Sequence, residues 1–507
     1  MKIPKAWNLK KRCNLGRNTQ KLRIFRRIVM NEKIENKKTR IVCTIGPATQ
    51  DETMIKKLIN AGMNVARLNT SHDTIADHEK RVNLIKKIRK DLNIPFAILL
   101  DLEGPKIRTG KFETDQVMLE EGQKFILTIE EIVGNKERVS INYRELPKEV
   151  KKGDFILLDD GKIRLVVVSS NEKEIVTKVV TGGSITHRRG INVPGIDISL
   201  PPLTEKDMEY LNKAVEWNVD YIAQSFVRKA EDITRTRRIL TELGMPDLPI
   251  IAKIETLQAL DNLESIIEEA DGVMVARGDL GVEAPVEQIP LLQKRIIEIA
   301  NTMAKPAITA TQMLESMVNN PFPTRAEATD IANAILDGTD AVMLSEETSI
   351  GKYPEQAVKV MANVAKETEK ILEEYYYKFD YSTYGGGDPA TNSITMSAIK
   401  IAEQLGIDVI VATTYSGYTA RALSRFRRNI KIVAASPRIT TYHRLALIWG
   451  VTPVIMQKFT DTDNMLESVS NIVKSLDFGV SGENIIVTAG IPYGFSSKTN
   501  LLKVHEI

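Results

Sequence analysis

Short apolar runs alternate with longer amphipathic segments from Thr39 onward, and this alternation is typical of parallel βα units. Eight of the runs predict strands; they are RIVCTIG, NVARLN, FAILLDL, DYIAQSF, PIIAKIE, DGVMVARGD, KPAITAT and DAVMLSEET. Strands connected in this way favour a closed (β/α)8 barrel, the TIM barrel. The pattern therefore predicts an α/β fold with the strands at the centre and the helices outside.

The third run is not followed by a helix. Between residues 107 and 194, apolar and polar positions alternate with a period of two and are interrupted by turn signals such as DDG. This pattern predicts a small inserted β-barrel domain, with the two parts of the large barrel at 39–106 and 195–374. Because the insertion leaves from the carboxyl end of a strand, we expect it to lie over the barrel rim and act as a lid.

A third pattern begins at residue 375, in a stretch of aromatic residues, glycines and a proline. Beyond it, the apolar runs IDVIVATT, KIVAAS, TPVIM and NIIVTAG alternate with segments of helical length. This alternation predicts an open α/β sheet. We expect a separate C-terminal α/β domain over residues 375–507.

Composition narrows the classes of function. The 507 residues are 43% hydrophobic and 27% charged, with a formal net charge of +3, which is too polar for a membrane protein. Apart from the N-terminus, the basic residues are spread along the chain, so we expect small-molecule partners and no nucleic acid. The two cysteines cannot form a disulfide framework, and no apolar run approaches a membrane span or a signal peptide. These features favour the cytoplasm.

The first 38 residues are strongly basic and have little apolar periodicity. We expect a disordered extension over residues 1–38. A translation start at Met30 and a transit peptide are the other interpretations of this segment, although a transit peptide would contain more serine.

Charged and hydroxyl side chains gather at the carboxyl ends of the predicted strands, the rim where barrels of this type carry their chemistry. They are Arg67, Asn69, Asp101, Ser225, Lys253, Glu255, Asp279, Thr311, Ser345 and Glu346. Lys253 and Glu255 stand two residues apart in one strand, so both point to the same side. An unpaired charge buried there would cost several kcal/mol, so each of them requires a partner.

Several motifs, taken in order, resemble those of the pyruvate kinase family. They are TRIVCTIGPAT, GMNVARLNTSH, LLDLEGPKIRTG, IIAKIE, DGVMVARGDLGVE, KPAITATQMLESM and NPFPTRAEATDIANAILDGTDAVMLSEETSIGKYP, and the resemblance extends from residue 39 to residue 507. It implies transfer of the phosphoryl group of phosphoenolpyruvate to ADP, giving pyruvate and ATP, the last step of glycolysis, with Mg²⁺ or Mn²⁺ as cofactor. It also implies a homotetramer.

The resemblance assigns roles to the charged rim residues. Glu255 and Asp279 would supply carboxylate oxygens to one Mg²⁺, whose remaining positions go to water and substrate. Lys253 would neutralise charge on the phosphoryl group as it moves. A plain buried ion pair between Lys253 and Glu255 is the alternative interpretation.

Further substrate contacts follow from the same resemblance. Gly278 lies where a strand turns into a short helix, so backbone N–H groups at Gly278 and Asp279 would receive the substrate carboxylate, assisted by the Thr311 hydroxyl. Arg67 and Ser225 are expected on the phosphoryl group, Arg67 through its planar fork. An ordinary turn at Gly278 and a salt-bridged Arg67 are the alternatives.

The family also points to a nucleotide site beside these residues. The matching positions are Asn69, Thr70, Ser71, His72 and Arg108, with Arg189 on the lid.

A potassium site is implied at Asn69, Ser71 and Asp101. Family members that require K⁺ carry a glutamate and a threonine where this chain has Lys106 and Leu102. Because a lysine ammonium can take the place of a monovalent cation, we predict activity that is largely independent of K⁺.

In the C-terminal domain, VATTYSGYTARALSRF is typical of a strand, a hydroxyl-rich loop and a helix. Thr414, Ser416 and Thr419, with the loop N–H groups, would form a nest for the phosphate of an effector. The later loop GIPYGFSSKTN lacks the arginines of the family's fructose bisphosphate sites, so the identity of the effector stays open. A capping turn without a ligand is the alternative.

Two other functions stay open. A Mg²⁺-dependent lyase that binds phosphoenolpyruvate or pyruvate would share the metal carboxylates but would not need the nucleotide residues or the lid. A catalytically silent metabolite sensor would predict damage at the rim, whereas Arg67, Lys253, Glu255, Asp279 and Thr311 are all present. Formation of ATP separates a kinase from both.

Overall fold

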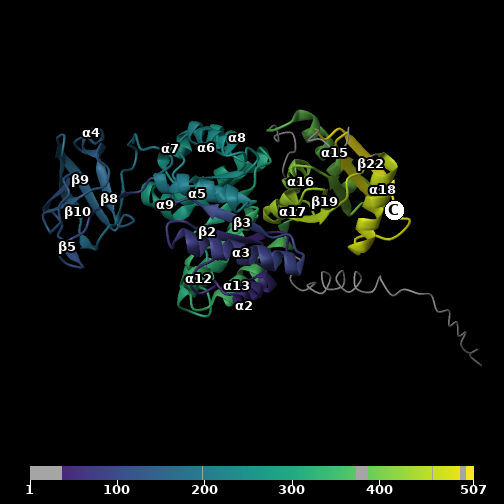
Figure 1. Cartoon of the computed structure of the whole chain (residues 1–507), viewed down its shortest axis with the longest axis horizontal. Coiled ribbons are helices and arrows are strands. Elements are labelled where there is room, and N and C mark those ends of the chain that lie inside the picture. Colours follow the sequence, from purple (N-terminus) through teal and green to yellow (C-terminus); the bar gives the residue numbers. More distant parts are fainter. Residues whose placement is uncertain (1–36, 197, 373–385, 460, 492–497) are drawn as a thin grey trace, which may run out of the picture.

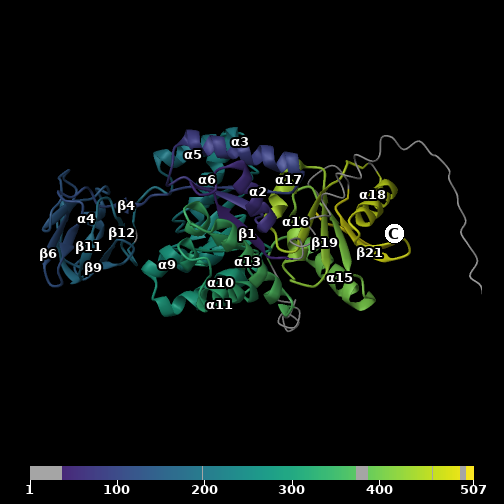
Figure 2. The same cartoon turned by 90° about the horizontal axis from the view of Figure 1, so that it is seen from below.

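The computed structural model describes residues 37–196, 198–372, 386–459, 461–491 and 498–507. Residues 1–36 of the basic segment, including the start at Met30, lie outside the described residues. The extension was predicted to be disordered up to residue 38, which is wrong for its last two residues, because buried Lys37 donates to Asn64 Oδ1 at 2.6 Å and the Lys38 N–H donates to Glu369 Oε2 at 2.7 Å. Figures 1 and 2 show three bodies in a row: the inserted β domain, the barrel, and the C-terminal domain on the opposite side of the barrel.

A closed barrel of parallel strands forms the centre of the molecule, in the order β1-β17-β16-β15-β14-β13-β3-β2. The strands are β1 (Arg40–Thr44), β2 (Val65–Asn69), β3 (Ala97–Asp101), β13 (Tyr221–Gln224), β14 (Ile250–Ile254), β15 (Gly272–Ala276), β16 (Ala307–Ala310) and β17 (Ala341–Leu344). Each predicted apolar run contains one of these strands, which confirms the predicted barrel.

Helices surround the barrel, and several of them begin at side chains that cap their free N–H groups. Capping boxes at Thr74, Thr204 and Thr324 start α3, α5 and α11. The helices are α2 (Glu52–Ala61), α3 (Ile75–Leu92), α5 (Glu205–Glu216), α6 (Ala230–Glu242), α7 (Leu257–Asp261), α8 (Leu263–Glu269), α9 (Arg277–Glu283), α10 (Ile289–Thr302), α11 (Arg325–Leu336), α12 (Glu346–Ser349) and α13 (Pro354–Glu369), with 3-10 turns η1 (Val286–Gln288) and η2 (Glu315–Val318).

The inserted domain has a seven-stranded sheet in the order β4-β12-β8-β9-β10-β6-β7 and a two-stranded sheet, β11-β5. Its elements are β4 (Ile107–Arg108), β5 (Val117–Leu119), β6 (Lys124–Thr128), β7 (Arg138–Ser140), α4 (Leu146–Glu149), β8 (Phe155–Leu158), β9 (Ile163–Ser170), β10 (Glu174–Thr181), β11 (Gly183–Ile185) and β12 (Gly190–Asn192). An antiparallel bridge between Thr109 and Ile141 joins the two edges, so the sheet closes into a small barrel.

The C-terminal domain has a five-stranded sheet in the order β20-β19-β18-β21-β22. Its elements are α15 (Pro389–Leu405), β18 (Val409–Thr413), α16 (Tyr418–Ser424), β19 (Lys431–Ser436), α17 (Ile439–Arg444), η4 (Leu445–Leu447), β20 (Val451–Ile455), α18 (Thr462–Ser475), β21 (Asn484–Ala489) and β22 (Leu501–Glu506). The four predicted strands are present. The antiparallel edge strand β22 was not predicted, because most of its side chains are partly exposed and give no apolar run.

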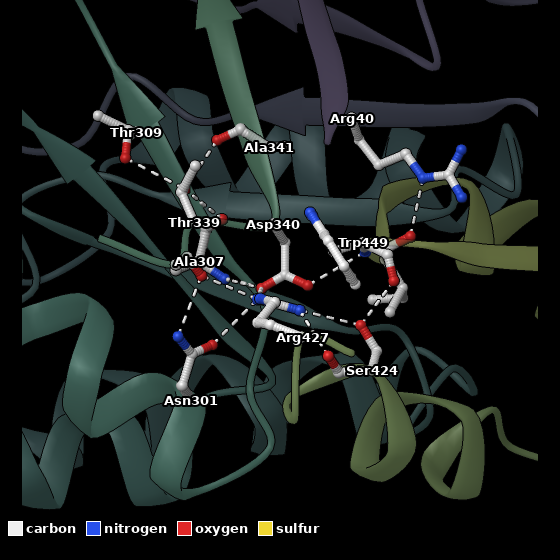
Figure 3. A network of polar contacts seen from close by, with 12 residues as sticks. Arg40, Asn301, Ala307, Thr309, Thr339, Asp340, Ala341, Ser424, Arg427 and Trp449 are labelled. Atoms are coloured by element: carbon white, nitrogen blue, oxygen red, sulfur yellow. Dashed lines mark hydrogen bonds and ion pairs between the residues drawn. The ribbon is translucent and has the colours of Figure 1, made fainter. Parts of the chain in front are cut away.

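A buried polar network joins the C-terminal domain to the amino-terminal rim of the barrel (Figure 3). Arg427 Nη2 lies 2.9 Å from Asp340 Oδ2 and also donates to the carbonyl oxygen of Gly338 at 2.8 Å. The Trp449 N–H donates to Asp340 Oδ1 at 3.2 Å, and Arg40 Nε donates to the Ile448 carbonyl oxygen at 2.8 Å. The C-terminal domain therefore covers one end of the barrel and leaves the carboxyl rim to the inserted domain.

Among the described residues, no helix combines the length and the apolar character that crossing a membrane requires.

Candidate active site

The predicted rim residues come together at the ends of four neighbouring strands. Arg67 lies in β2, Asp101 ends β3, Ser225 follows β13, and Lys253 lies in β14 directly before Ile254 and Glu255. All five side chains are buried, which requires that their polar atoms find partners within the cluster.

Lys253 is the centre of this cluster. Its Nζ donates to Ser225 Oγ at 2.6 Å, and lies 2.9 Å from Glu255 Oε1 and 3.4 Å from Asp101 Oδ1. The Ser225 hydroxyl in turn donates to the Leu102 carbonyl oxygen at 2.7 Å. The ammonium is thus held between two carboxylates at a fixed position on the rim.

Arg67 is held in the same way. Its Nε donates to Asp101 Oδ2 at 2.6 Å, and its Nη1 donates to Thr44 Oγ1 at 2.8 Å. Thr44, in β1, donates its own hydroxyl to the carbonyl oxygen of Leu344 in β17. The Arg67 guanidinium is therefore linked to Asp101 in β3 on one side and, through Thr44, to β17 on the other. Asp101 therefore stands between the two cations of the site, Arg67 and Lys253.

The electrostatics of the cluster follow from burial and from these pairs. Burial lowers the pKa of Lys253, but Asp101 and Glu255 raise it more, so the net change is upward and the ammonium stays charged. Burial raises the pKa of Asp101, yet Lys253 and Arg67 outweigh it and hold the carboxyl ionised. For Glu255, burial raises the pKa more than Lys253 lowers it, and Asp279 adds a further rise.

Glu255 has one oxygen engaged and one available. Oε2 accepts the Phe226 N–H at 2.7 Å, whereas Oε1 accepts no well-aligned hydrogen bond although Lys253 lies near it. Phe226 has a φ of 53°, a left-handed conformation that turns its N–H toward the carboxylate.

Glu255 and Asp279 together fit a magnesium site. Asp279, in α9, interacts electrostatically with Glu255, and its side chain is 33% exposed at the rim. Within the described part of the chain, no group of three or more histidine, cysteine, aspartate or glutamate side chains is arranged to hold a metal. Two carboxylates suit Mg²⁺, which keeps several positions for water and substrate oxygens.

Thr311 and Gly278 meet at the ends of β16 and β15. The Gly278 N–H donates to Thr311 Oγ1 at 2.7 Å, so this predicted carboxylate-binding amide and hydroxyl lie together. Thr311 has a φ of 70°, which is unusual for a β-branched residue. Arg277 holds it there by donating from Nη2 to the Thr311 carbonyl oxygen at 2.6 Å, while its Nη1 pairs with Asp330 at 2.7 Å.

Sequence reasoning assigned no role to Thr44, Phe226 or Arg277. The contacts of Thr44 and Arg277 cross between strands that are far apart in the sequence, so no local pattern marks them. Phe226 contributes a backbone N–H, which no side-chain motif can indicate.

Comparisons with known proteins show the family of this chain. The family model described as pyruvate kinase, barrel domain, matches residues 36–358, and the model described as pyruvate kinase, alpha/beta domain, matches residues 392–505. The chain belongs to the pyruvate kinase family. It is 45% identical to a pyruvate kinase of Thermotoga maritima over 92% of this chain and 99% of that protein. It is 44% identical to one of Staphylococcus aureus over 93% of this chain and 80% of that protein.

A solved structure supports the same assignment. The crystal structure of a pyruvate kinase from Cryptosporidium parvum superposes with a TM-score of 0.87 at 35% identity, covering 94% of this chain and 97% of that one. The resemblance to the pyruvate kinase family and the predicted fold class are confirmed.

The residues predicted to bind the nucleotide lie on the rim and at the base of the inserted domain. Thr70 donates its N–H and its hydroxyl to the Asp101 carbonyl oxygen, each at 3.0 Å, and the Ser71 N–H donates to Asn69 Oδ1 at 3.2 Å. The carbonyl oxygen of the exposed His72 lies 2.9 Å from His78 Nε2.

Arg108 lies in β4, and Arg189 directly precedes β12, the strand that pairs with β4. Arg108 Nη2 donates to Glu103 Oε1 at 3.1 Å, and Arg189 Nε donates to Thr186 Oγ1 at 2.5 Å. Arg189 Nε also lies 3.4 Å from Asp159 Oδ1. Both arginine side chains are partly exposed.

Two of the three residues predicted as potassium ligands, Asp101 and Asn69, face other groups. Asp101 faces Arg67 and Lys253, and Asn69 Oδ1 accepts the Ser71 N–H. Lys106 lies along Gly190 and directs Nζ to within 3.8 Å of Asp279 Oδ1. The ammonium of Lys106 is thus placed at the predicted metal carboxylate.

The hydroxyl-rich loop of the C-terminal domain is an ordered turn before α16. Thr414 Oγ1 accepts the Gly417 N–H at 2.9 Å, and Ser416 Oγ accepts the Tyr418 N–H at 3.4 Å. Thr419 shares a 2.6 Å hydrogen bond with Thr499. The later loop GIPYGFSSKTN, which has no arginine to bind an effector, falls mostly on residues 492–497 and so lies mostly outside the described residues.

Proposed function

We propose that this chain transfers the phosphoryl group of phosphoenolpyruvate to ADP and releases pyruvate and ATP. The single observation that carries the proposal is the position of Lys253, a buried ammonium held beside Ser225, Asp101 and Glu255 at the carboxyl rim. Electrostatic stabilisation by a fixed cation in a water-poor site is the main contribution a protein can make to phosphoryl transfer.

Each rim residue has a proposed role in that reaction. Lys253, Arg67 and the Ser225 hydroxyl bind the phosphoryl oxygens, and Lys253 neutralises the charge that develops as the group leaves. The Gly278 and Asp279 N–H groups receive the substrate carboxylate, which requires Thr311 Oγ1 to release the Gly278 N–H. The released hydroxyl then lies where the enolate carbon takes up its proton.

Glu255 and Asp279 are proposed to hold Mg²⁺ or Mn²⁺, which when bound supplies positive charge to the phosphate and carboxylate oxygens. Asn69, Thr70, Ser71, His72, Arg108 and Arg189 are proposed to bind the nucleotide. The inserted domain is then the lid that brings Arg108 and Arg189 over the rim.

The test is pyruvate formation from phosphoenolpyruvate and ADP in the presence of Mg²⁺. Turnover that produces equal amounts of pyruvate and ATP supports the proposal. Pyruvate with inorganic phosphate in place of ATP would indicate hydrolysis and refute the kinase. No pyruvate would favour the lyase or the metabolite-binding alternative.

We further propose that turnover is largely independent of K⁺, because the Lys106 ammonium supplies a monovalent charge near Asp279. The test repeats the assay with K⁺ and with a bulky organic cation in its place. Equal rates support the proposal, and the variant Lys106→Glu should then require added K⁺. Wild-type activity that appears only with K⁺ would refute it.

Four further features are proposed from family membership. The chain forms a homotetramer, and a phosphorylated effector binds at Thr414, Ser416 and Thr419. Its location is the cytoplasm, and its domain limits are 106/107, 194/195 and 374/375. Light scattering on the purified chain tests the first. Binding of a sugar phosphate that is lost in Thr414→Val tests the second, because that variant removes a loop hydroxyl.

A further inference from the structure

A cavity of about 290 Å³ lies at the hinge between the inserted domain and the barrel. Apolar side chains, among them Ile107, Ile191, Val193, Ile196, Leu200 and Leu257, share its wall with polar and charged ones. Its volume is near the lower end of the range for small-molecule sites, which combine apolar surface with placed polar groups. None of the residues assigned above to the substrate or the nucleotide lines this cavity.

Both connections between the two domains line the cavity. The outgoing connection contributes Pro105 to Ile107. The described residues that the returning connection contributes are Ile191, Asn192, Val193, Gly195, Ile196, Ile198 and Leu200. Figure 1 shows the inserted domain standing away from the barrel, with extended segments leading to it. Any change in the orientation of the inserted domain must therefore alter the shape of this cavity.

The barrel side of the cavity is fixed. Arg228 donates to the carbonyl oxygens of Ile198 and Leu200, each at 2.6 Å, and so fastens the returning connection to the barrel. Glu283 accepts the Leu257 N–H at 3.1 Å. Glu283 is also linked to Asn192 of the inserted domain by a side-chain hydrogen bond, whereas the Arg228 contacts need no side chain of that domain. The part of the wall that Arg228 holds is therefore available as a preformed half of a binding site.

The charged groups on the wall favour an anion at one end. Lys106 lines the cavity, and its Nζ lies 3.8 Å from Asp279 Oδ1. The proposed metal would occupy this carboxylate and leave the Lys106 ammonium to pair with another anion. Arg228 is already paired with Asp232 at 3.7 Å, and burial raises the pKa of Glu283, which favours its neutral form. Asp261 is the remaining carboxyl on the wall.

We propose that this hinge cavity binds a small amphipathic molecule with an apolar body and one anionic group, the body among the hinge isoleucines and the anion on Lys106. Occupancy holds the two hinge connections in the arrangement seen here. On the proposed function, which this consequence rests on, the bound molecule hinders lid closure and lowers turnover without competing for the phosphoenolpyruvate site.

The cavity also touches the two segments that carry the metal carboxylates. Thr256, on its wall, directly follows Glu255, and Glu283 ends the same helix that contains Asp279. A ligand in the cavity thus contacts the backbone that positions both carboxylates. This route is separate from the hydroxyl-rich loop of the C-terminal domain, which lies at the other end of the barrel.

The test uses 8-anilinonaphthalene-1-sulfonate, a fluorescent probe with an apolar body and one sulfonate, titrated into the full chain. We expect saturable binding at one site per chain that persists with saturating ADP and Mg²⁺. Ile196→Trp, which fills the cavity, should weaken binding at least tenfold. The matched control Val168→Trp places the same ring at a position that is 45% exposed in β9 and does not line the cavity, and it should bind as the wild type does.

Displacement of the probe by ADP, or equal binding by the two tryptophan variants, would overturn the proposal. If Ile196→Trp does not fold, Lys106→Met provides the second variant, and unchanged affinity for the sulfonate in that variant would refute the assigned anion position. In the pyruvate assay, the probe should lower kcat with little change in KM for phosphoenolpyruvate. Binding without any effect on kcat would refute the coupling to the lid, whereas absence of pyruvate formation in the free chain would refute only the proposed function.

Discussion

Replacing Lys253 by methionine tests the central feature of the site. Methionine keeps an unbranched apolar stem of similar length and removes the ammonium that contacts Ser225, Asp101 and Glu255. On the proposed function, the variant loses a fixed electrostatic stabiliser of the transition state, and a loss of this kind typically reduces kcat by roughly 10²–10³-fold. The measurement is kcat for pyruvate formation at saturating phosphoenolpyruvate, ADP and Mg²⁺.

The same change should lower the stability of the free protein. Asp101 keeps Arg67 as a partner, but Glu255 is left buried with only the Phe226 N–H. Removing one partner of a buried ion pair costs about 3–5 kcal/mol, which calorimetry resolves as a fall in Tm. Lys213→Met is the matched control, because Lys213 pairs with Glu216 on the outer helix α5, far from the rim chemistry, and should leave both kcat and Tm nearly unchanged.

The pH dependence of that stability difference has a definite sign. In the wild type, burial raises the pKa of Glu255 and the Lys253 ammonium lowers it. The variant lacks this ammonium, so the pKa of Glu255 should rise further. A carboxyl whose folded pKa lies above its unfolded value destabilises the fold only while it is ionised, and the penalty falls as protonation begins. The Tm difference between variant and wild type should therefore shrink from pH 8 to pH 5. A variant with kcat within tenfold of the wild type, or a Tm difference that grows at low pH, would refute this reasoning.

Three further predictions concern positions around the site and the domain contact. Gly104→Ala forces a side chain onto a φ of 72° and places Cβ 2.9 Å from Ser225 Cβ, so Tm should fall and kcat should fall with it in the same two assays. Asp340→Asn leaves Arg427 buried without its carboxylate, and urea unfolding should show a loss of about 3–5 kcal/mol. Burial lowers the pKa of His443 to about 3, so its contribution to stability should be lost as pH falls below about 6.5. The drop in Tm from pH 7 to pH 5 should then be smaller in His443→Gln than in the wild type.

The barrel and its rim were predictable from the sequence because both leave local signals. Each central strand is an apolar run flanked by an amphipathic helix. The period of two that runs through β14 into the next residue places Lys253 and Glu255 on one side. Parallel strands share one carboxyl end, so residues at strand ends must meet there. The contact of Lys253 with Asp101 and Ser225 is the direct consequence of that topology.

The features that were missed leave no such signal. Strands β4, β11 and β12 contain only two or three residues, too short for a period to appear, so the way the inserted sheet closes was not predicted. The Arg427 contact with Asp340 joins residues 87 positions apart, and neither neighbourhood differs from an ordinary polar turn. The hinge cavity depends on five separate segments and exists only once they are folded together.

The balance of charge at the rim explains why metal and substrate would need each other on the proposed function. In the free protein, the two buried cations Arg67 and Lys253 are matched by the two buried carboxylates Asp101 and Glu255. When Glu255 gives Oε1 to the metal, Lys253 loses its nearest carboxylate, and an anionic phosphoryl group becomes its replacement partner. A phosphoryl group arriving without the metal would instead meet Glu255 ionised and in contact with the same ammonium, which costs like-charge repulsion in a low-dielectric site. Binding of phosphoenolpyruvate should therefore be weak without the divalent ion and strengthen with it, through a carboxylate that changes partners and not through a change in fold.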